Sequence, residues 1–183
     1  CYKKQESIAK EILIVTGDIY NLKRWFLEKN RETPHLTLVL LDQVTDPQNV
    51  GAIARSSLAL GAHGMILQSR NAPKLDGMLA KAASGATEYI PIFRVTNIAR
   101  AIRKMQDFDI SCLGLAGESD VSINNTSLTT RVALVLGAEG AGLRRLTRES
   151  CDQLVSLPTV GHFSTLNVSN AASIALYELQ RLS

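Results

Sequence analysis

Short apolar runs recur at fairly regular intervals from residue 36 onward, with longer mixed stretches between them. The runs are Leu36–Leu41, Met65–Leu67, Tyr89–Phe93, Cys112–Leu115, Val132–Leu136 and Leu154–Leu157. Most intervening stretches, for example Thr96–Met105, space their apolar residues as amphipathic helices do. Buried strands that alternate with helices are typical of proteins with a parallel sheet. The pattern therefore predicts an α/β fold, with a mostly parallel sheet flanked by helices.

Glycine-rich or polar segments follow three of the predicted strands directly. They are Gly114–Gly117, Gly137–Gly142 and Ser156–Gly161. Ligands of open α/β sheets bind at the carboxyl ends of the strands. We therefore expect these three segments to contribute to one shared site.

Residues 1–33 follow a different pattern, in which 18–29 has the spacing of a helix with one apolar side. Pro34 then interrupts regular structure before the first predicted strand. We interpret residues 1–33 either as an extension of the domain or as the remnant of an upstream domain. The main domain is expected to cover residues 34–183.

Composition narrows the class of protein. Hydrophobic residues make up 45% of the chain and aromatic residues only 5%, so the core must be largely aliphatic. The three cysteines are too few and too dispersed for a disulfide framework or a zinc site, which favours a reducing compartment. The histidines share no metal-ligand spacing, so no metal is expected.

No apolar run reaches membrane-spanning length and no signal peptide is visible. The chain begins with Cys1 instead of Met, so we expect a fragment.

The loop Leu136–Gly142 indicates more about the charge of the ligand than any other segment. Its sequence is LGAEGAG, and glycines after a buried strand let the backbone approach a ligand closely. Glu139 would repel a phosphate, and the spacing fits neither a P-loop nor a G-x-G-x-x-G dinucleotide turn. The loop therefore predicts a ligand that is neutral or cationic where it touches the protein.

A helix is predicted over residues 47–60, because Asp46 is a good N-cap, Pro47 suits the first helical position and Gly61 suits the residue after the end. Arg55 lies opposite its apolar face, among small residues. A solvated face normally carries several charges, so this arrangement indicates close contact with another surface, such as a second subunit. A lone surface arginine is the alternative.

Charge is distributed unevenly, although the net charge is only +3. Arg144, Arg145 and Arg148 cluster on a predicted helix just beyond the glycine loop. Taken by itself, such a cluster favours a solvated helix face.

Three stretches together resemble the SpoU (TrmH-type) family of RNA ribose 2′-O-methyltransferases, in the SPOUT superfamily. They are Leu41–Gly51 with Arg55, the loop Leu136–Gly142, and Thr165–Ser169. The likeness runs from about residue 36 to residue 182. The stretch Gly137–Pro158 looks closest to the branch that modifies guanosine in bacterial large-subunit rRNA, so the arginine cluster now favours RNA binding.

The resemblance implies a sheet whose C-terminal part forms a deep trefoil knot, an exception to the usual rule against knots. It also implies S-adenosylmethionine as cofactor, a homodimer with the active site near the subunit interface, a cytoplasmic location and no membrane. Members of the closest branch carry an N-terminal RNA-binding domain, which residues 1–33 do not match.

Site residues follow from the resemblance by matching position. The cofactor is expected to contact Ala116, Gly117, Gly137, Ala138, Gly140, Leu157 and Leu166. The catalytic positions are Asn49, Arg55, Glu139, Thr165 and Asn167, and the RNA-binding positions are Arg144, Arg145 and Arg148. The chain departs from the family at Thr165, where serine is usual, and at Asn170, where an apolar residue is common.

The resulting hypothesis is methyl transfer to a ribose 2′-hydroxyl. Arg55 would contact the ribose and stabilise the developing alkoxide, because the very high pKa of arginine side chains makes them poor general bases. Asn167 and Thr165 would orient the ribose or Arg55, and Glu139 would fix the loop. Three alternatives stay open: a tRNA methyltransferase, a nucleotide- or NAD-binding enzyme on an ordinary doubly wound sheet, and an inactive RNA-binding or ribosome-assembly protein of the same fold.

Overall fold

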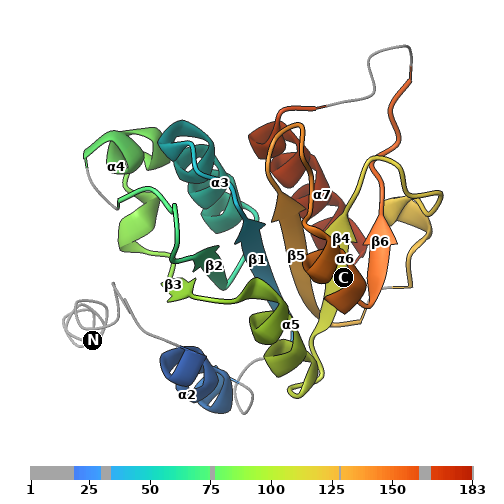
Figure 1. The fold of residues 1–183 in the computed structure, drawn as a ribbon, viewed down its shortest axis with the longest axis horizontal. Coiled ribbons are helices and arrows are strands. Elements are labelled where there is room, and N and C mark those ends of the chain that lie inside the picture. Colours follow the sequence, from blue (N-terminus) through green and yellow to red (C-terminus); the bar gives the residue numbers. More distant parts are fainter. Residues whose placement is uncertain (1–18, 30–33, 75–76, 128, 161–165, 183) are drawn as a thin grey trace.

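A computed structural model describes residues 19–29, 34–74, 77–127, 129–160 and 166–182 (Figure 1). The helices are α2 (Ile19–Lys29), α3 (Pro47–Ala59), α4 (Gly77–Ala83), α5 (Ile98–Gln106), α6 (Arg145–Ser150) and α7 (Val168–Leu182), with short 3-10 helices η2 (Ala86–Glu88) and η3 (Ile123–Asn125). The strands are β1 (Leu36–Asp42), β2 (Gly64–Gln68), β3 (Ile92–Val95), β4 (Ser111–Leu115), β5 (Arg131–Gly137) and β6 (Gln153–Val155). None of the helices described is long and apolar enough to cross a membrane.

The six strands form one parallel sheet in the order β3-β2-β1-β5-β4-β6. Strands β1 and β5 are central, and they pair from Leu36 opposite Arg131 to Asp42 opposite Gly137. The predicted α/β fold with a mostly parallel sheet is confirmed. Because all strands run the same way, the loops after them meet at one edge of the sheet.

Four strands match their predicted bounds to within one residue at each end, and two strands, β3 and β6, differ by more. The predicted run Tyr89–Phe93 is displaced, since Tyr89 is 72% exposed and its N–H donates to Ala86 O in a turn. Pro91 has no N–H to donate, and strand β3 starts just after it. Strand β6 ends at Val155, so Leu157 lies in the loop beyond it.

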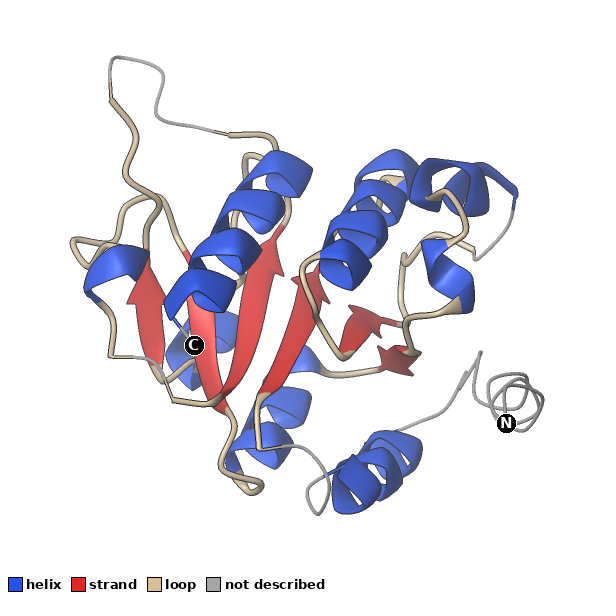
Figure 2. Ribbon diagram, turned by 180° about the vertical axis from the view of Figure 1, so that it is seen from behind, coloured by secondary structure: helices blue, strands red, loops and turns tan. Residues whose placement is uncertain are grey.

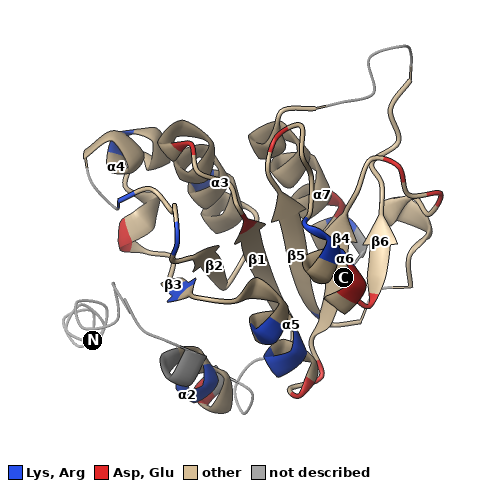
Figure 3. Ribbon diagram, in the orientation of Figure 1, with Lys and Arg blue, Asp and Glu red and all other residues tan. Residues whose placement is uncertain are grey.

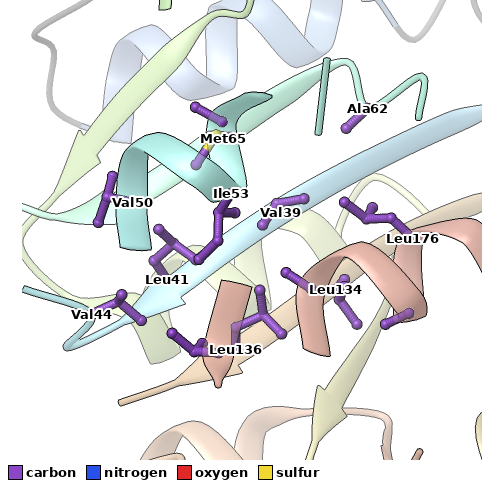
Figure 4. Packing of buried hydrophobic residues seen from close by; sticks show 14 of the residues in the cluster. Val39, Leu41, Val44, Val50, Ile53, Ala62, Met65, Leu134, Leu136 and Leu176 are labelled. Carbon is purple, nitrogen blue, oxygen red and sulfur yellow. The ribbon is translucent and has the colours of Figure 1, made fainter. Parts of the chain in front are cut away.

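The core has two layers, one on each face of the sheet. Leu36, Leu38 and Leu40 of β1 pack with α2 and α5, whereas Val39 and Leu41 face α3 and α7. Figure 2 shows helices on both faces, and Figure 4 shows the layer between the sheet and helices α3 and α7. Both layers are mainly aliphatic, as the composition predicts.

Helix α2 packs on the sheet through its apolar side. Leu22, Trp25 and Phe26 are buried, with at most 7% of each residue exposed. Trp25 contacts Phe93 of β3, with 5.3 Å between the ring centroids. The helix is therefore part of the domain's own core.

Helix α3 begins as predicted and ends within one residue of the predicted end. The Asp46 carboxylate accepts hydrogen bonds from the N–H groups of Gln48 and Asn49, at 3.2 and 3.1 Å. Gly61 has φ +77°, the left-handed conformation expected just after a helix. The helix is one residue shorter than predicted, ending at Ala59.

Small residues on the Arg55 side of α3 have a partner within the same chain. Gly51 packs so closely on α4 that an added Cβ would lie 2.6 Å from Ala82 Cβ and 2.8 Å from Leu79 O. The close contact that the sequence indicated is therefore at least partly made by α4, which the local pattern of α3 could not identify. Arg55 itself is exposed.

Candidate active site

A cavity of about 440 Å³ lies at the carboxyl ends of β4, β5 and β6 and beside the start of α7. Most residues expected to contact a cofactor line this cavity: Gly117, Gly137, Ala138, Gly140, Leu157 and Leu166. Ala116 is absent from the lining and is buried behind it, where its N–H donates to Val155 O at 2.9 Å. The three loops after these strands therefore do share one cavity, as predicted.

The glycines of the loop after β5 are required by the loop itself. A Cβ on Gly137 would lie 2.1 Å from the carbonyl carbon of Gly142, and Gly140 and Gly142 have positive φ values of 76° and 66°. Ala138 and Gly142 exchange two backbone hydrogen bonds, at 3.2 and 2.8 Å. The turn would need these glycines with or without a ligand, so their presence alone does not indicate a ligand.

Three polar side chains from distant parts of the chain meet at the mouth of this loop. Asn167 Nδ2 donates to Asn49 Oδ1 at 3.0 Å and lies 3.4 Å from Glu139 Oε1. Asn167 Oδ1 accepts from the N–H and the hydroxyl of Ser169, at 2.9 and 2.6 Å. Since Ala171 N–H donates to Asn167 O, Asn167 also caps α7. We call Asn49, Glu139 and Asn167 the amide–carboxylate cluster.

Arg55 has a hydrogen-bond partner outside the amide–carboxylate cluster. Its Nη1 donates to Ser84 Oγ at 3.2 Å, in the turn that follows α4. Ser84 has φ +50°, a left-handed conformation that costs a non-glycine residue of order 1–2 kcal/mol. Ser84 was not predicted as part of the site, although the Ser84-Gly85 dipeptide is a turn signal. Thr165 lies outside the described residues.

The three arginines beyond the glycine loop are each paired with a carboxylate. Arg144 donates to the buried Asp42 from its backbone N–H (3.1 Å) and from Nε (2.8 Å), with Nη2 at 2.6 Å. Arg145 pairs with Glu149 at 2.9 Å in an exposed contact, and Arg148 pairs with Glu118. Figure 3 shows the basic residues of α5 and α6. Asp42 and Glu118 were not anticipated, because no local pattern links them to arginines so far along the chain.

Electrostatics at the cavity favour a charged carboxylate. The hydrogen bond from Arg148 lowers the pKa of Glu118, which lines the cavity.

Burial raises the pKa of the Cys151 thiol to about 12, and the charges of Asp152 and Asp42 raise it further. Burial likewise raises the pKa of Cys112 far above its usual range. Both thiols are therefore neutral at physiological pH, and neither is an activated nucleophile.

Together, the parallel sheet and the cavity at its carboxyl edge define a small-ligand-binding α/β protein, with a polar cluster suited to positioning a second reactant. Residues 36–177 match the SpoU rRNA Methylase family, and the chain belongs to that family. The resemblance found in the sequence is thereby confirmed.

Two curated proteins that are 48% identical to this chain have the same name. The 23S rRNA (guanosine-2'-O-)-methyltransferase RlmB of Photorhabdus laumondii is 48% identical over 150 residues, which is 82% of this chain and 61% of the relative. The protein of that name from Escherichia coli K12 is 48% identical over 144 residues, or 79% and 59% of the two chains. This chain therefore spans about three fifths of the length of these relatives.

Solved structures of methyltransferases have the same fold as this chain. The SpoU methyltransferase AviRb from Streptomyces viridochromogenes, in complex with AdoMet, superposes with a TM-score of 0.75 at 33% identity. The superposition covers 82% of this chain and 58% of AviRb. An AdoMet-bound rRNA methyltransferase from Sinorhizobium meliloti superposes with a TM-score of 0.75 at 29% identity, over 83% and 59% of the two chains.

Proposed function

We propose that this protein transfers a methyl group from S-adenosylmethionine to a ribose 2′-hydroxyl of structured RNA, with a guanosine of 23S rRNA as its target. The observation that carries the proposal is the amide–carboxylate cluster, because it assembles Asn49, Glu139 and Asn167 beside the cavity. The names of the curated relatives support the target.

The cavity has the size and chemistry that S-adenosylmethionine needs. Its volume of about 440 Å³ lies within the range of small-molecule sites. Leucines at positions 115, 136, 157 and 166 offer apolar surface for an adenosine, and the carboxylates of Glu118 and Glu139 suit a ligand with cationic groups. When bound, the cofactor supplies an electrophilic methyl group on a sulfonium centre.

The protein's own part in the reaction is to position and polarise the ribose hydroxyl. Asn167 can donate to the ribose with the N–H that lies 3.4 Å from Glu139, a long contact that a substrate oxygen can replace, while Asn49 holds the amide in place. Arg55 stabilises the negative charge that develops on the oxygen, since a guanidinium is a hydrogen-bond donor without an acceptor. Thr165 adds a hydroxyl to this set. Arg144, Arg145 and Arg148 contact RNA phosphates through N–H groups not used by their carboxylate partners.

Arg55 reaches the reaction centre from a second copy of the chain. Within one copy its guanidinium is bonded to Ser84, and helices α3 and α7 carry exposed apolar side chains at Leu58, Ile174 and Tyr177. Exposed apolar side chains on neighbouring helices suit a subunit interface. A homodimer through α3 and α7 would bring Arg55 of one subunit toward the amide–carboxylate cluster of the other.

The C-terminal part of the chain forms a trefoil knot in this proposal. The chain leaves β6 at the sheet edge, yet Asn167 contacts Asn49, so the path must cross the ends of β4 and β5. Ser156 is hydrogen-bonded to Val121 and Ile123 in the long loop after β4, which is the loop such a path would pass through. We also assign residues 34–183 to the methyltransferase domain, residues 1–33 to an extension or remnant of an upstream domain, and the protein to the cytoplasm.

Binding and transfer assays test the proposal. Calorimetry should detect binding of S-adenosylmethionine and no binding of NAD, and labelled methyl groups should pass to unmodified 23S rRNA but not to tRNA. Binding of NAD alone would favour an ordinary dinucleotide-binding enzyme. Cofactor binding without transfer to any RNA would identify an inactive RNA-binding protein, and transfer to tRNA alone would change the substrate.

A further inference from the structure

A second cavity, of about 280 Å³, lies at the carboxyl ends of β2 and β3. It is lined by polar groups of Gln68, Thr96 and Asn97, by Arg144 and Arg145, and by the apolar side chain of Leu146. None of these residues lines the first cavity. The two cavities nevertheless share a loop, since Gly142 lines the first and Arg144 the second.

Gln68 is the unusual residue of this second cavity. It is the last residue of β2 and is only 8% exposed. Its Oε1 is buried and accepts no hydrogen bond from any part of the chain that the structure describes. A buried amide oxygen without a partner destabilises the fold, so its presence in a residue that lines a cavity points to a ligand group that completes its hydrogen bonding.

We propose that this second cavity binds one unpaired nucleotide of the RNA substrate, next in the strand to the region that reaches the first cavity. The inference rests on the proposed function. The buried Gln68 Oε1 would turn toward the cavity and accept a hydrogen bond from an amino or imino group of the base, while Leu146 and the Arg145 guanidinium offer surface for its face. Unstacked bases of single-stranded RNA are recognised by such edge and face contacts.

The surrounding charges suit the phosphate of the same nucleotide. Asn97 caps α5, a nine-residue helix, and the first N–H groups of that helix lie at the positive end of its dipole. Among the described residues, Arg145 pairs with the exposed Glu149, a pairing that is weak in water and that a phosphate can displace. Arg144 is tied to Asp42 and so presents its remaining N–H groups from a fixed position.

The distance between the cavities fits a single strand that occupies the second cavity and runs past the mouth of the first. Gly142 and Arg144 are two residues apart, so their Cα atoms are separated by at most about 7.6 Å. A strand that places one nucleotide against Gln68 therefore keeps its neighbours close to the amide–carboxylate cluster. The second cavity would thus make the enzyme selective for the unpaired base next to the modified nucleotide. The first cavity does not supply this selectivity.

The test measures RNA binding by the full chain without S-adenosylmethionine, using fluorescein-labelled single-stranded RNA oligonucleotides. Gln68→Leu should raise the Kd for the oligonucleotide by roughly 3- to 10-fold, as expected for one lost hydrogen bond. It should also raise Tm, because it removes a buried amide that lacks a partner. Thr96→Val, at an exposed position, should weaken binding without a change in Tm. Gln153→Leu, the same substitution as the first but on β6, should leave RNA binding unchanged.

Salt dependence separates base contacts from phosphate contacts. Gln68→Leu should leave the slope of log Kd against log salt unchanged, whereas Arg145→Gln should reduce it by about 0.7. Unchanged RNA affinity in both Gln68→Leu and Thr96→Val would overturn the proposal. So would weakened binding of free guanosine monophosphate with unchanged binding of the oligonucleotide, which would assign the cavity to a free nucleotide. Because no methyl transfer is measured, a failure of the proposed function leaves this result interpretable.

Discussion

Asn167 donates its side-chain amide to Asn49 Oδ1 at 3.0 Å, across 118 positions of the sequence. The same side chain caps α7 through its oxygen, so the start of that helix and the start of α3 are joined by one residue. The amide is thereby fixed at the edge of the cavity, with Glu139 as a further neighbour. A group fixed from two sides is well suited to orient a reactant.

Replacing Asn167 with aspartate keeps the cap of α7 and removes the hydrogen bond to Asn49. Aspartate is as good an N-cap as asparagine, so Tm should change little. The new carboxylate cannot donate to Asn49 and would face Glu139 at close range, so kcat for methyl transfer should fall by about tenfold or more. Transfer at the wild-type rate in Asn167→Asp would show that the amide donor has no part in the reaction.

The pairing of Asp42 with Arg144 should stabilise the fold. Asp42 is fully buried and accepts from both the backbone and the side chain of Arg144, so Asp42→Asn should lower the free energy of unfolding by about 1–3 kcal/mol. Glu149→Gln breaks the exposed pair with Arg145 and should cost at most about 0.5 kcal/mol. Urea denaturation measures both. Equal losses in the two variants would contradict the difference in burial.

The turn at Ser84 should hold Arg55 for its role in transfer. Arg55→Ala should abolish transfer and leave the Kd of S-adenosylmethionine near that of the wild type. Ser84→Ala and Ser84→Gly both remove the hydroxyl that accepts from Arg55, so each should slow transfer by roughly 2- to 10-fold. The glycine variant should be about 1 kcal/mol more stable than the alanine variant, because φ is +50°. Full activity in Ser84→Gly would show that the hydroxyl does not position Arg55.

The contact between α3 and α4 should not tolerate a methyl group at Gly51. Alanine is normally favoured over glycine within a helix by about 1 kcal/mol. Here an added Cβ would lie 2.6 Å from Ala82 Cβ, so Gly51→Ala should instead destabilise the protein by about 1–3 kcal/mol. Gly77→Ala is the matched control, since its Cβ would meet no atom within 4 Å. Thermal unfolding compares them, and a higher Tm for Gly51→Ala would rule out the tight packing.

Local chemistry made much of the fold predictable. The bounds of α3 follow from Asp46, Pro47 and Gly61, and the strands follow from short aliphatic runs. The rule that ligands bind at the carboxyl ends of parallel strands then predicted that the loops after β4, β5 and β6 would meet. The family resemblance added Asn49, Glu139 and Asn167, whose side chains the structure brings together.

Two of the features that were missed depend on the order of the strands. Asp42 meets Arg144 because β1 lies beside β5, and no local pattern contains that pairing. Gln68 borders a cavity because β2 and β3 are neighbours and α6 packs near their ends. Contacts of this kind join residues far apart in sequence, so they become visible only once the sheet order is known.

The most direct test of the proposed function is to locate the transferred methyl group on the RNA. Unmodified 23S rRNA would be incubated with the protein and isotope-labelled S-adenosylmethionine, digested to nucleosides and analysed by mass spectrometry. If the proposed function is right, labelled 2′-O-methylguanosine will come from one site, with the label on the ribose. Label on a base, or no label in rRNA despite cofactor binding, would contradict it.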